Sequence, residues 1–219
     1  MAGRIRKSFK RGSFIRETQK LFVIASEGTE TEPRYFEEFK SSEWHQDKSI
    51  FIEVLERKNL GSNPQRVLKQ LKDFKKEYRL TDRDELWMLI DRDRQAWTVA
   101  EIDRVAQECL QSNFGFAMSN PAFEIWLLLH LKNLNEYSQE TKDEFLQNRK
   151  TGNRTRLESE LVTILGSFNK SNLDAGKFLP GLQLAIDRSQ SLDNNPSERW
   201  PNHLGTHVYK LIKRLTNSL

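Results

Sequence analysis

Short apolar runs alternate with stretches of helical spacing along residues 21–131. Patterns typical of β-strands, rich in branched and aromatic side chains, occupy residues 21–25, 50–55, 86–90 and 114–118. The run at 86–90 is apolar on both faces, which predicts a strand buried on both sides. Good N-cap residues and prolines of a first helical turn predict helix starts at Thr31-Glu32-Pro33, Asn63-Pro64 and Asn120-Pro121, and a further helix spans residues 99–110.

The alternation of strands and helices predicts an α/β fold. Right-handed crossovers would give a mostly parallel, four-stranded, Rossmann-like sheet flanked by helices. Residues 135–219 contain amphipathic stretches and few β-branched runs, so we expect a helical C-terminal region packed on the core. The predicted organisation is a basic flexible tail over 1–20, an α/β core over 21–134 and a helical region over 135–219.

The composition excludes several classes of protein. Apolar residues make up 37% of the chain, with five Trp and 13 Phe, which is enough for a packed core. One cysteine excludes a disulfide framework and any multi-cysteine zinc site. The longest apolar runs hold five residues, whereas a membrane-spanning helix needs about 20. The basic N-terminus lacks an apolar segment, so we expect no secretory signal, no membrane partner and a cytoplasmic location.

The formal charge of +4 is unevenly distributed. Residues 1–20 carry seven basic groups and one acid, which leaves a net charge of −2 on the other 199 residues. A basic tail can bind phosphates by charge alone, and it can equally be a solvated, mobile terminus. The net charge therefore adds little about function unless the tail is tested by itself.

Acidic residues follow two of the predicted strands. Glu27-Gly28 follows the first strand, and Asp91-Arg92-Asp93 follows the third. Ligands bind at the carboxyl ends of strands in an open parallel sheet, so these three carboxylates converge if the two strands are neighbours. Converging carboxylates repel one another unless they are protonated or bind a cation, and Mg²⁺ is the usual ion, with Mn²⁺ the alternative. Taken separately, Asp91 and Asp93 are also ordinary helix caps.

This joint pattern resembles the Toprim domain, and three further blocks narrow the resemblance to the RloB family. The blocks are Ser26 to Phe36, Ile90 to Asp93 and Ser119 to His130, and the segment from Pro201 to Leu215 is similar to the family's C-terminal helix. The resemblance covers most of residues 21–215. It implies a Toprim-like fold and a protein of prokaryotic antiviral or abortive-infection loci, commonly encoded with an ATPase.

The resemblance also implies roles for individual acids. Glu27 would act as general base or metal ligand, while Asp91 and Asp93 would hold Mg²⁺. Glu32 either serves a second metal or is an acid favoured by the dipole of its helix. Glu124 either reaches the metal site or substrate as a catalytic residue, or is likewise a dipole-favoured acid. We expect His130 to be packed or hydrogen-bonded, because six residues place it on a different helical face from Glu124.

The leading hypothesis is a Mg²⁺-dependent nuclease that cuts RNA or DNA. The chain is too short for a topoisomerase gate, and it lacks the zinc cysteines of primases. It also lacks a phosphate-binding P-loop, so ATP hydrolysis would belong to a separate AAA- or ABC-type subunit. One alternative is a non-catalytic, metal-binding subunit whose helical part docks the ATPase. Another is phosphotransfer on a small nucleotide. The oligomeric state stays open, a homo-oligomer included.

Overall fold

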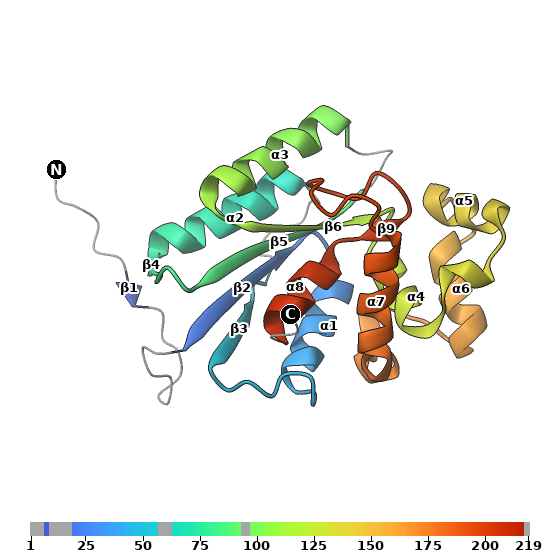
Figure 1. Ribbon diagram of the computed structural model, residues 1–219, viewed down its shortest axis with the longest axis horizontal. Coiled ribbons are helices and arrows are strands. Elements are labelled where there is room, and N and C mark those ends of the chain that lie inside the picture. The colour runs from blue at the N-terminus through green and yellow to red at the C-terminus, as the bar shows by residue number, and fades with distance from the viewer. Residues whose placement is uncertain (1–6, 9–18, 57–62, 93–96, 217–219) are drawn as a thin grey trace.

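A five-stranded, mostly parallel sheet forms the centre of the molecule (Figure 1). The computed structural model describes residues 7–8, 19–56, 63–92 and 97–216. The order of the strands is β3-β2-β5-β6-β9, and only β9 runs antiparallel to its neighbour. Their bounds are Lys20–Ser26 for β2, Ile50–Val54 for β3, Glu85–Asp91 for β5, Gly115–Asn120 for β6 and Gly205–Thr206 for β9.

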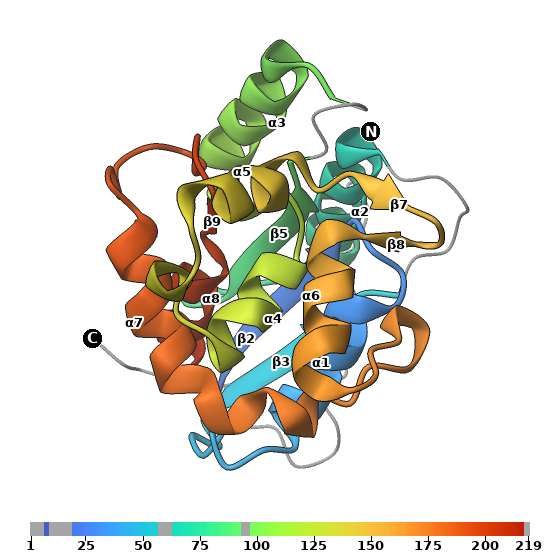
Figure 2. The same ribbon diagram turned by 90° about the vertical axis from the view of Figure 1, so that its right-hand side faces the viewer.

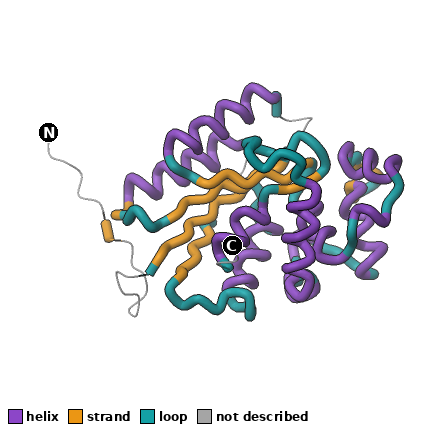
Figure 3. Tube along the Cα trace, viewed as in Figure 1, coloured by secondary structure: helices purple, strands orange, loops and turns teal. Residues whose placement is uncertain are grey.

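Helices cover both faces of this sheet (Figures 1 and 3). The helices α2 and α3 lie on one face, and α1 and α8 lie on the other. The bounds are Thr31–Lys40 for α1, Pro64–Glu77 for α2, Val99–Ser112 for α3 and Val208–Leu215 for α8. Local signals fix the starts of two of them: Asn63 Oδ1 accepts from the Gln65 amide, and Thr98 with Glu101 forms a capping box.

Alternate strand residues divide the core into two layers. On β5, Leu86, Met88 and Ile90 pack towards α2 and α3, whereas Trp87 and Leu89 pack towards α1 and α8. By the same alternation, the next residue, Asp91, lies on the α1 side. The prediction that this strand is buried on both faces is therefore confirmed.

The helical C-terminal part lies beside the carboxyl ends of the strands (Figure 2). It is built around α4, in which every side chain from Ile125 to Leu129 is fully buried. The bounds are Glu124–Leu131 for α4, Gln139–Gln147 for α5, Arg156–Leu165 for α6 and Leu182–Leu192 for α7. A two-stranded hairpin, β7 (Lys150–Thr151) with β8 (Arg154–Thr155), joins α5 to α6, and short 3₁₀ turns span Leu134–Glu136, Lys170–Asn172, Ala175–Lys177 and Leu179–Gly181.

The α/β fold class and the helical C-terminal part are confirmed, with three local differences. The sheet has a fifth strand, β9, which the sequence did not predict because it is only two residues long. Helix α4 begins at Glu124 instead of Asn120-Pro121, and that peptide bond is cis. Thr31 is the first residue of α1 instead of its cap. The domain boundaries at 20 and 134 stay a prediction.

The structure bears on the predicted N-terminal tail and on the prediction that no helix spans a membrane. Within the described parts of the N-terminal tail, β1 (Lys7–Ser8) pairs in parallel with β4 (Tyr78–Arg79), and Lys7 forms an ion pair with Glu77 at 3.1 Å. Residues 1–6 and 9–18 lie outside the described residues. No helix in the described ranges is long and apolar enough to cross a membrane.

Candidate active site

The ends of two neighbouring strands bring Glu27 and Asp91 together. Strand β2 pairs with β5 in parallel, with Ser26 opposite Leu89, and the Glu27 amide donates to the Leu89 carbonyl at 2.9 Å. The Glu27 carboxylate accepts from the Asp91 amide at 3.4 Å and from the Trp97 indole at 3.3 Å. Glu27 is only 8% exposed. The first and third strands of the α/β core are therefore neighbours, which is the condition under which we expect their terminal acids to converge.

Glu32 points back from the first turn of α1 to the same loop. Its Oε1 accepts from the Gly28 amide at 3.1 Å, and its side chain is buried. A Cβ built on Gly28 would overlap the Glu32 carboxyl, so a glycine is required for this close approach. The position also satisfies the preference for acids at a helix N-terminus, so both interpretations of Glu32 remain compatible with its geometry.

Glu124 is the first residue of α4 and is 2% exposed. Its Oε1 lies 2.7 Å from Lys170 Nζ, while its Oε2 is buried without a hydrogen-bond partner among the described residues. Buried carboxylate oxygens are almost always satisfied, so an orphaned one points to a missing partner such as a cation or a water.

Lys170 and Glu158 extend the cluster, and the sequence analysis missed both. Lys170 lies in the 3₁₀ turn Lys170–Asn172, and its Nζ is 2.8 Å from Glu158 Oε1 on α6. Burial lowers the pKa of Lys170, but Glu124 and Glu158 outweigh that effect and raise it, so the ammonium stays charged. Glu158 was recognisable as the fourth residue of a Thr-x-x-Glu capping box, whereas no local signal marks Lys170.

The carboxylates perturb one another strongly. Burial first, and then the charge of Glu124, raises the pKa of Glu32 to about 7, although its own amide and that of Gly28 oppose the shift. Burial, followed by the charges of Glu32, Glu124 and Glu27, also raises the pKa of Asp91 well above its ordinary value. These mutual effects place Glu27, Glu32, Asp91 and Glu124 in one electrostatic unit, named the acid cluster below. Such a unit binds protons or cations in preference to standing fully charged.

The acid cluster fits a divalent cation by chemistry, although its side chains do not converge on one point. Within the described part of the chain, no three His, Cys, Asp or Glu side chains are arranged to hold a metal ion. The Glu27 carboxylate accepts from the Trp97 indole, whereas the Glu32 carboxylate accepts from the Gly28 amide. The fit rests instead on four hard oxygen donors, an orphaned oxygen on Glu124 and two raised pKa values. Asp93, the third predicted metal ligand, lies outside the described residues.

His130 and Cys109 lie away from the acid cluster. His130 is 3% exposed, and its ring contacts the Tyr35 hydroxyl at 3.0 Å and the Trp126 carbonyl at 2.8 Å. Burial lowers its pKa to about 3, so the ring is neutral. Cys109 is fully buried beside Met88, and burial raises the pKa of its thiol to about 12. His130 is therefore packed and hydrogen-bonded, as the sequence predicted, and Cys109 is a residue of the core.

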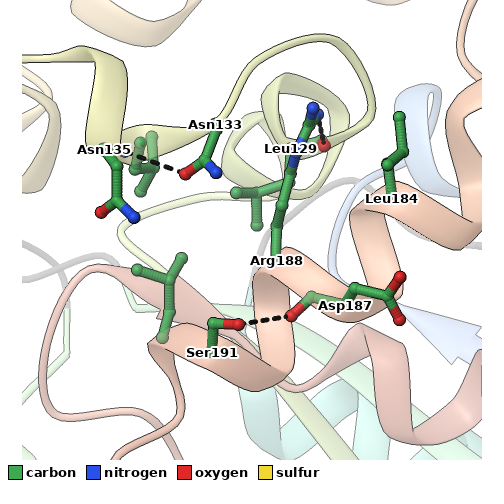
Figure 4. A pocket seen from close by; sticks show the side chains of 9 residues that line it. Leu129, Asn133, Asn135, Leu184, Asp187, Arg188 and Ser191 are labelled. Atoms are coloured by element: carbon green, nitrogen blue, oxygen red, sulfur yellow. Dashed lines mark hydrogen bonds between the residues drawn. The ribbon is translucent and has the colours of Figure 1, made fainter.

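A separate hollow lies between the end of α4 and helix α7 (Figure 4). Arg188 crosses it from α7 and donates to the Leu129 carbonyl at 2.7 Å, and Ser191 donates to the Asp187 carbonyl at 2.9 Å. These polar groups already serve the packing of α7 on α4, and the hollow contains none of the acid cluster. It is therefore a weaker candidate for chemistry than the carboxyl edge of the sheet.

Comparison with known families gives one result that covers most of the chain. The family described as RloB-like protein matches residues 22–215. Comparisons with curated proteins and with solved structures gave no match.

Proposed function

Because the chain belongs to the RloB-like protein family, we propose that it is a metal-dependent nuclease, the effector of an antiviral or abortive-infection system. The observation that carries the proposal is the acid cluster at the carboxyl ends of β2 and β5. Burial, and then the charges of neighbouring acids in this cluster, raise the pKa values of Glu32 and Asp91. Strongly perturbed carboxylates at this edge of an α/β sheet are typical of a functional site.

Asp91 would hold Mg²⁺ or Mn²⁺ together with Asp93, and Glu32 would bind a second ion. When bound, the ion stabilises the negative charge that develops on the phosphate during attack. The positive ion would also favour the ionised forms of Asp91 and Glu32, so metal binding would release protons from the acid cluster.

Glu27 would act as the general base. Its carboxylate is oriented by the Trp97 indole and the Asp91 amide, which suits a residue that must accept a proton at a fixed place. A water oxygen would form the new bond to phosphorus as its proton passes to Glu27. The bond from phosphorus to the leaving oxygen would then break, and that oxygen would take a proton from solvent.

Lys170 would balance the charge of the cluster on the side of Glu124. Its ammonium lies between Glu124 and Glu158, so Glu124 is held as a paired carboxylate. In this arrangement Glu124 positions Lys170 near the developing phosphate charge instead of accepting a proton itself.

The test is cleavage of labelled RNA and DNA by the purified chain, with Mg²⁺ and with EDTA. We expect Glu27→Gln and Asp91→Asn to abolish Mg²⁺-dependent cleavage. Glu30→Gln is the matched control, because Glu30 lies in the same loop but is half-exposed and paired only with Arg34 among the described residues. Cleavage that survives both Glu27→Gln and Asp91→Asn would contradict the assigned site.

The separate ATPase subunit is a further part of this proposal. It is supported by the family and by the lack of a P-loop in this sequence. Helix α8, which belongs to the helical C-terminal part that would dock the ATPase in the alternative hypothesis, buries Val208, Leu211, Ile212 and Leu215 in the core. A non-catalytic docking subunit would therefore need another surface, and co-purification of the ATPase with Glu27→Gln separates docking from cleavage.

A further inference from the structure

The hairpin β7–β8 carries a dense group of cations next to helix α6. Residues 149–156 include Arg149, Lys150, Arg154 and Arg156. Figure 2 shows the hairpin on the same side of the molecule as α4 and α6, to the right of the central strands. Strand β8 leads directly into α6, the helix that carries Glu158.

The base of the hairpin is rigidly held. Asn148 ends α5 in the left-handed conformation, and its Oδ1 accepts from the Leu157 amide of α6 at 3.0 Å. Arg156 joins the same helices, because it forms ion pairs with Glu144 on α5 and Glu160 on α6. Thr155 caps α6 with Glu158 as its partner. The cations above this base are therefore presented on a fixed projection instead of a loose loop.

The tip of the hairpin faces open space. Gly152 has a φ of 62° at the first central position of a two-residue turn, which is where a type II′ turn needs glycine. A Cβ built there meets no atom within 4 Å. Thr151 to Arg154 are all exposed, so the surface is free to contact a large ligand.

Three of the four cations have side chains without a partner among the described residues. Arg149, Lys150 and Arg154 are exposed, and none of their side chains forms an ion pair or a hydrogen bond with another described residue. Most other basic side chains in the described ranges are paired, such as Lys69 with Asp73 and Lys72 with Glu108. The register places Arg149 and Arg154 on one face of the hairpin and Lys150 on the other.

A chain of charges connects the hairpin to the acid cluster. Burial raises the pKa of Glu158, but hydrogen bonds from Lys170 and Thr155 and the charges of Lys170 and Lys150 outweigh it. Lys150 is therefore close enough to act on Glu158, which shares Lys170 with Glu124. A hairpin of cations beside a proposed metal site suits a ligand that carries negative charge, because the cations attract it and the metal offsets part of its charge.

We propose that the hairpin binds the phosphate backbone of a nucleic acid and guides it to the acid cluster. This inference rests on the proposed function, and it assigns substrate binding to Arg149, Lys150 and Arg154. Backbone contacts of this kind fix the position of a nucleic acid without reading its sequence. An anionic membrane fits less well, because residues 148–155 contain no large apolar side chain that could insert into lipid.

The experiment measures binding separately from cleavage. Fluorescence anisotropy with labelled single-stranded RNA, single-stranded DNA and duplex DNA is recorded in EDTA, so that no metal-dependent cleavage occurs. The test protein is the triple variant Arg149→Ser, Lys150→Ser, Arg154→Ser. The control removes three exposed, unpaired cations elsewhere, with Lys48→Ser, Lys76→Ser and Arg104→Ser, so that the net charge changes equally.

We expect the hairpin variant to bind about ten-fold more weakly or worse, and the slope of log K against log salt to fall by about 2–3. The control variant should keep the wild-type slope, and both variants should keep the wild-type melting temperature. Unchanged affinity and slope in the hairpin variant would overturn the inference, and so would a hairpin-dependent affinity for anionic vesicles alone.

The design separates this inference from the proposed function. If nucleic-acid binding depends on the hairpin but the wild-type protein never cleaves, the hairpin inference stands and the proposed nuclease function is wrong. If the hairpin variant cleaves and binds as tightly as wild type, the nuclease function stands and the hairpin inference is wrong. A wild-type protein that binds none of the three nucleic acids would overturn the inference.

Discussion

Lys170 Nζ lies 2.7 Å from Glu124 Oε1, so a cation in the helical C-terminal part contacts an acid of the candidate site. The contact spans two elements far apart in sequence, the turn Lys170–Asn172 and the start of α4. Glu124 is nearly fully buried, whereas the Lys170 side chain is 42% exposed. The charge state of the acid cluster therefore depends on a residue that the solvent also reaches.

Removal of the Lys170 charge tests this dependence. We expect Lys170→Met to lower the free energy of unfolding by about 1–2 kcal/mol, because it leaves Glu124 and Glu158 unpaired while solvent screens part of the loss. Mg²⁺ should then raise the melting temperature more in the variant than in wild type, because the cluster has lost its resident cation. Differential scanning fluorimetry with a Mg²⁺ titration measures both effects.

Lys132→Met is the matched control for that variant. Lys132 is equally exposed at 42%, but its partner Glu136 is on the surface. We expect a cost below about 0.5 kcal/mol and an unchanged response to Mg²⁺. Equal behaviour of the two variants would show that Lys170 is an ordinary surface lysine, and recovery in Lys170→Arg would show that the positive charge is what matters.

The raised pKa of Glu32 predicts how stability varies with pH in metal-free protein. The pKa of Glu32 is about 7 in the folded chain and 4.5 in its reference state, so the folded state binds more protons between these values. The contribution of Glu32 is complete below about pH 4.5 and is lost as the pH rises through about 7, by up to about 3 kcal/mol.

Comparison with Glu32→Gln removes this effect together with the part of the raised Asp91 pKa that the Glu32 charge causes. Burial lowers the pKa of His130 to about 3 and that of His207 to about 4, so both histidines make stability rise with pH in an overlapping range. They contribute equally to both proteins and cancel in the difference. Urea unfolding in EDTA should show wild type losing stability relative to Glu32→Gln from pH 4.5 to pH 7, and a constant difference would contradict the assigned pKa.

The fifth strand gives a prediction about stability alone. The hydroxyls of Thr206 and Ser119 lie 2.9 Å apart, and Thr206 Oγ1 also accepts from the Val208 amide at 3.1 Å. Thr206→Val keeps the shape but leaves two buried groups without partners, so we expect a loss of about 2–3 kcal/mol by urea unfolding. Thr206→Ser should recover most of it. The exposed Thr163→Val is the control, with an expected change below about 0.5 kcal/mol.

The sequence predicted the sheet because its strands follow from local patterns, and the same patterns place Glu27 and Asp91 at strand ends. The run from Leu86 to Ile90 is apolar throughout and is followed directly by Asp91, and Glu27 follows the run at 21–25 after one residue. Parallel strands share a carboxyl edge, so two acids far apart in sequence could be placed together. Their contact at 3.4 Å, through the Asp91 amide, agrees with that expectation.

Three features could not be predicted from the sequence, because they depend on contacts between residues far apart in the chain or on a turn that no local pattern indicates. Lys170 lies in a polar turn, and its role follows only from how α6 and α4 pack. The strand Gly205–Thr206 is two residues long, so its pairing with β6 has no periodicity to detect. The start of α4 was placed too early because Pro121 looks like a first-turn residue, whereas the chain turns first and the helix begins at Glu124.

The position of β9 at the edge of the sheet has a consequence for the time course of synthesis. Ser119 and Thr206 are 87 residues apart, so at roughly 5–20 residues per second the ribosome needs on the order of 4–17 s to deliver the partner of β6. Throughout that interval the β6 edge has no native neighbour, and helix α8 has not yet covered its face of the sheet. The sheet of the nascent chain therefore closes only after residues 205–215 have been added, so its last strand pairing is also one of its most distant in sequence.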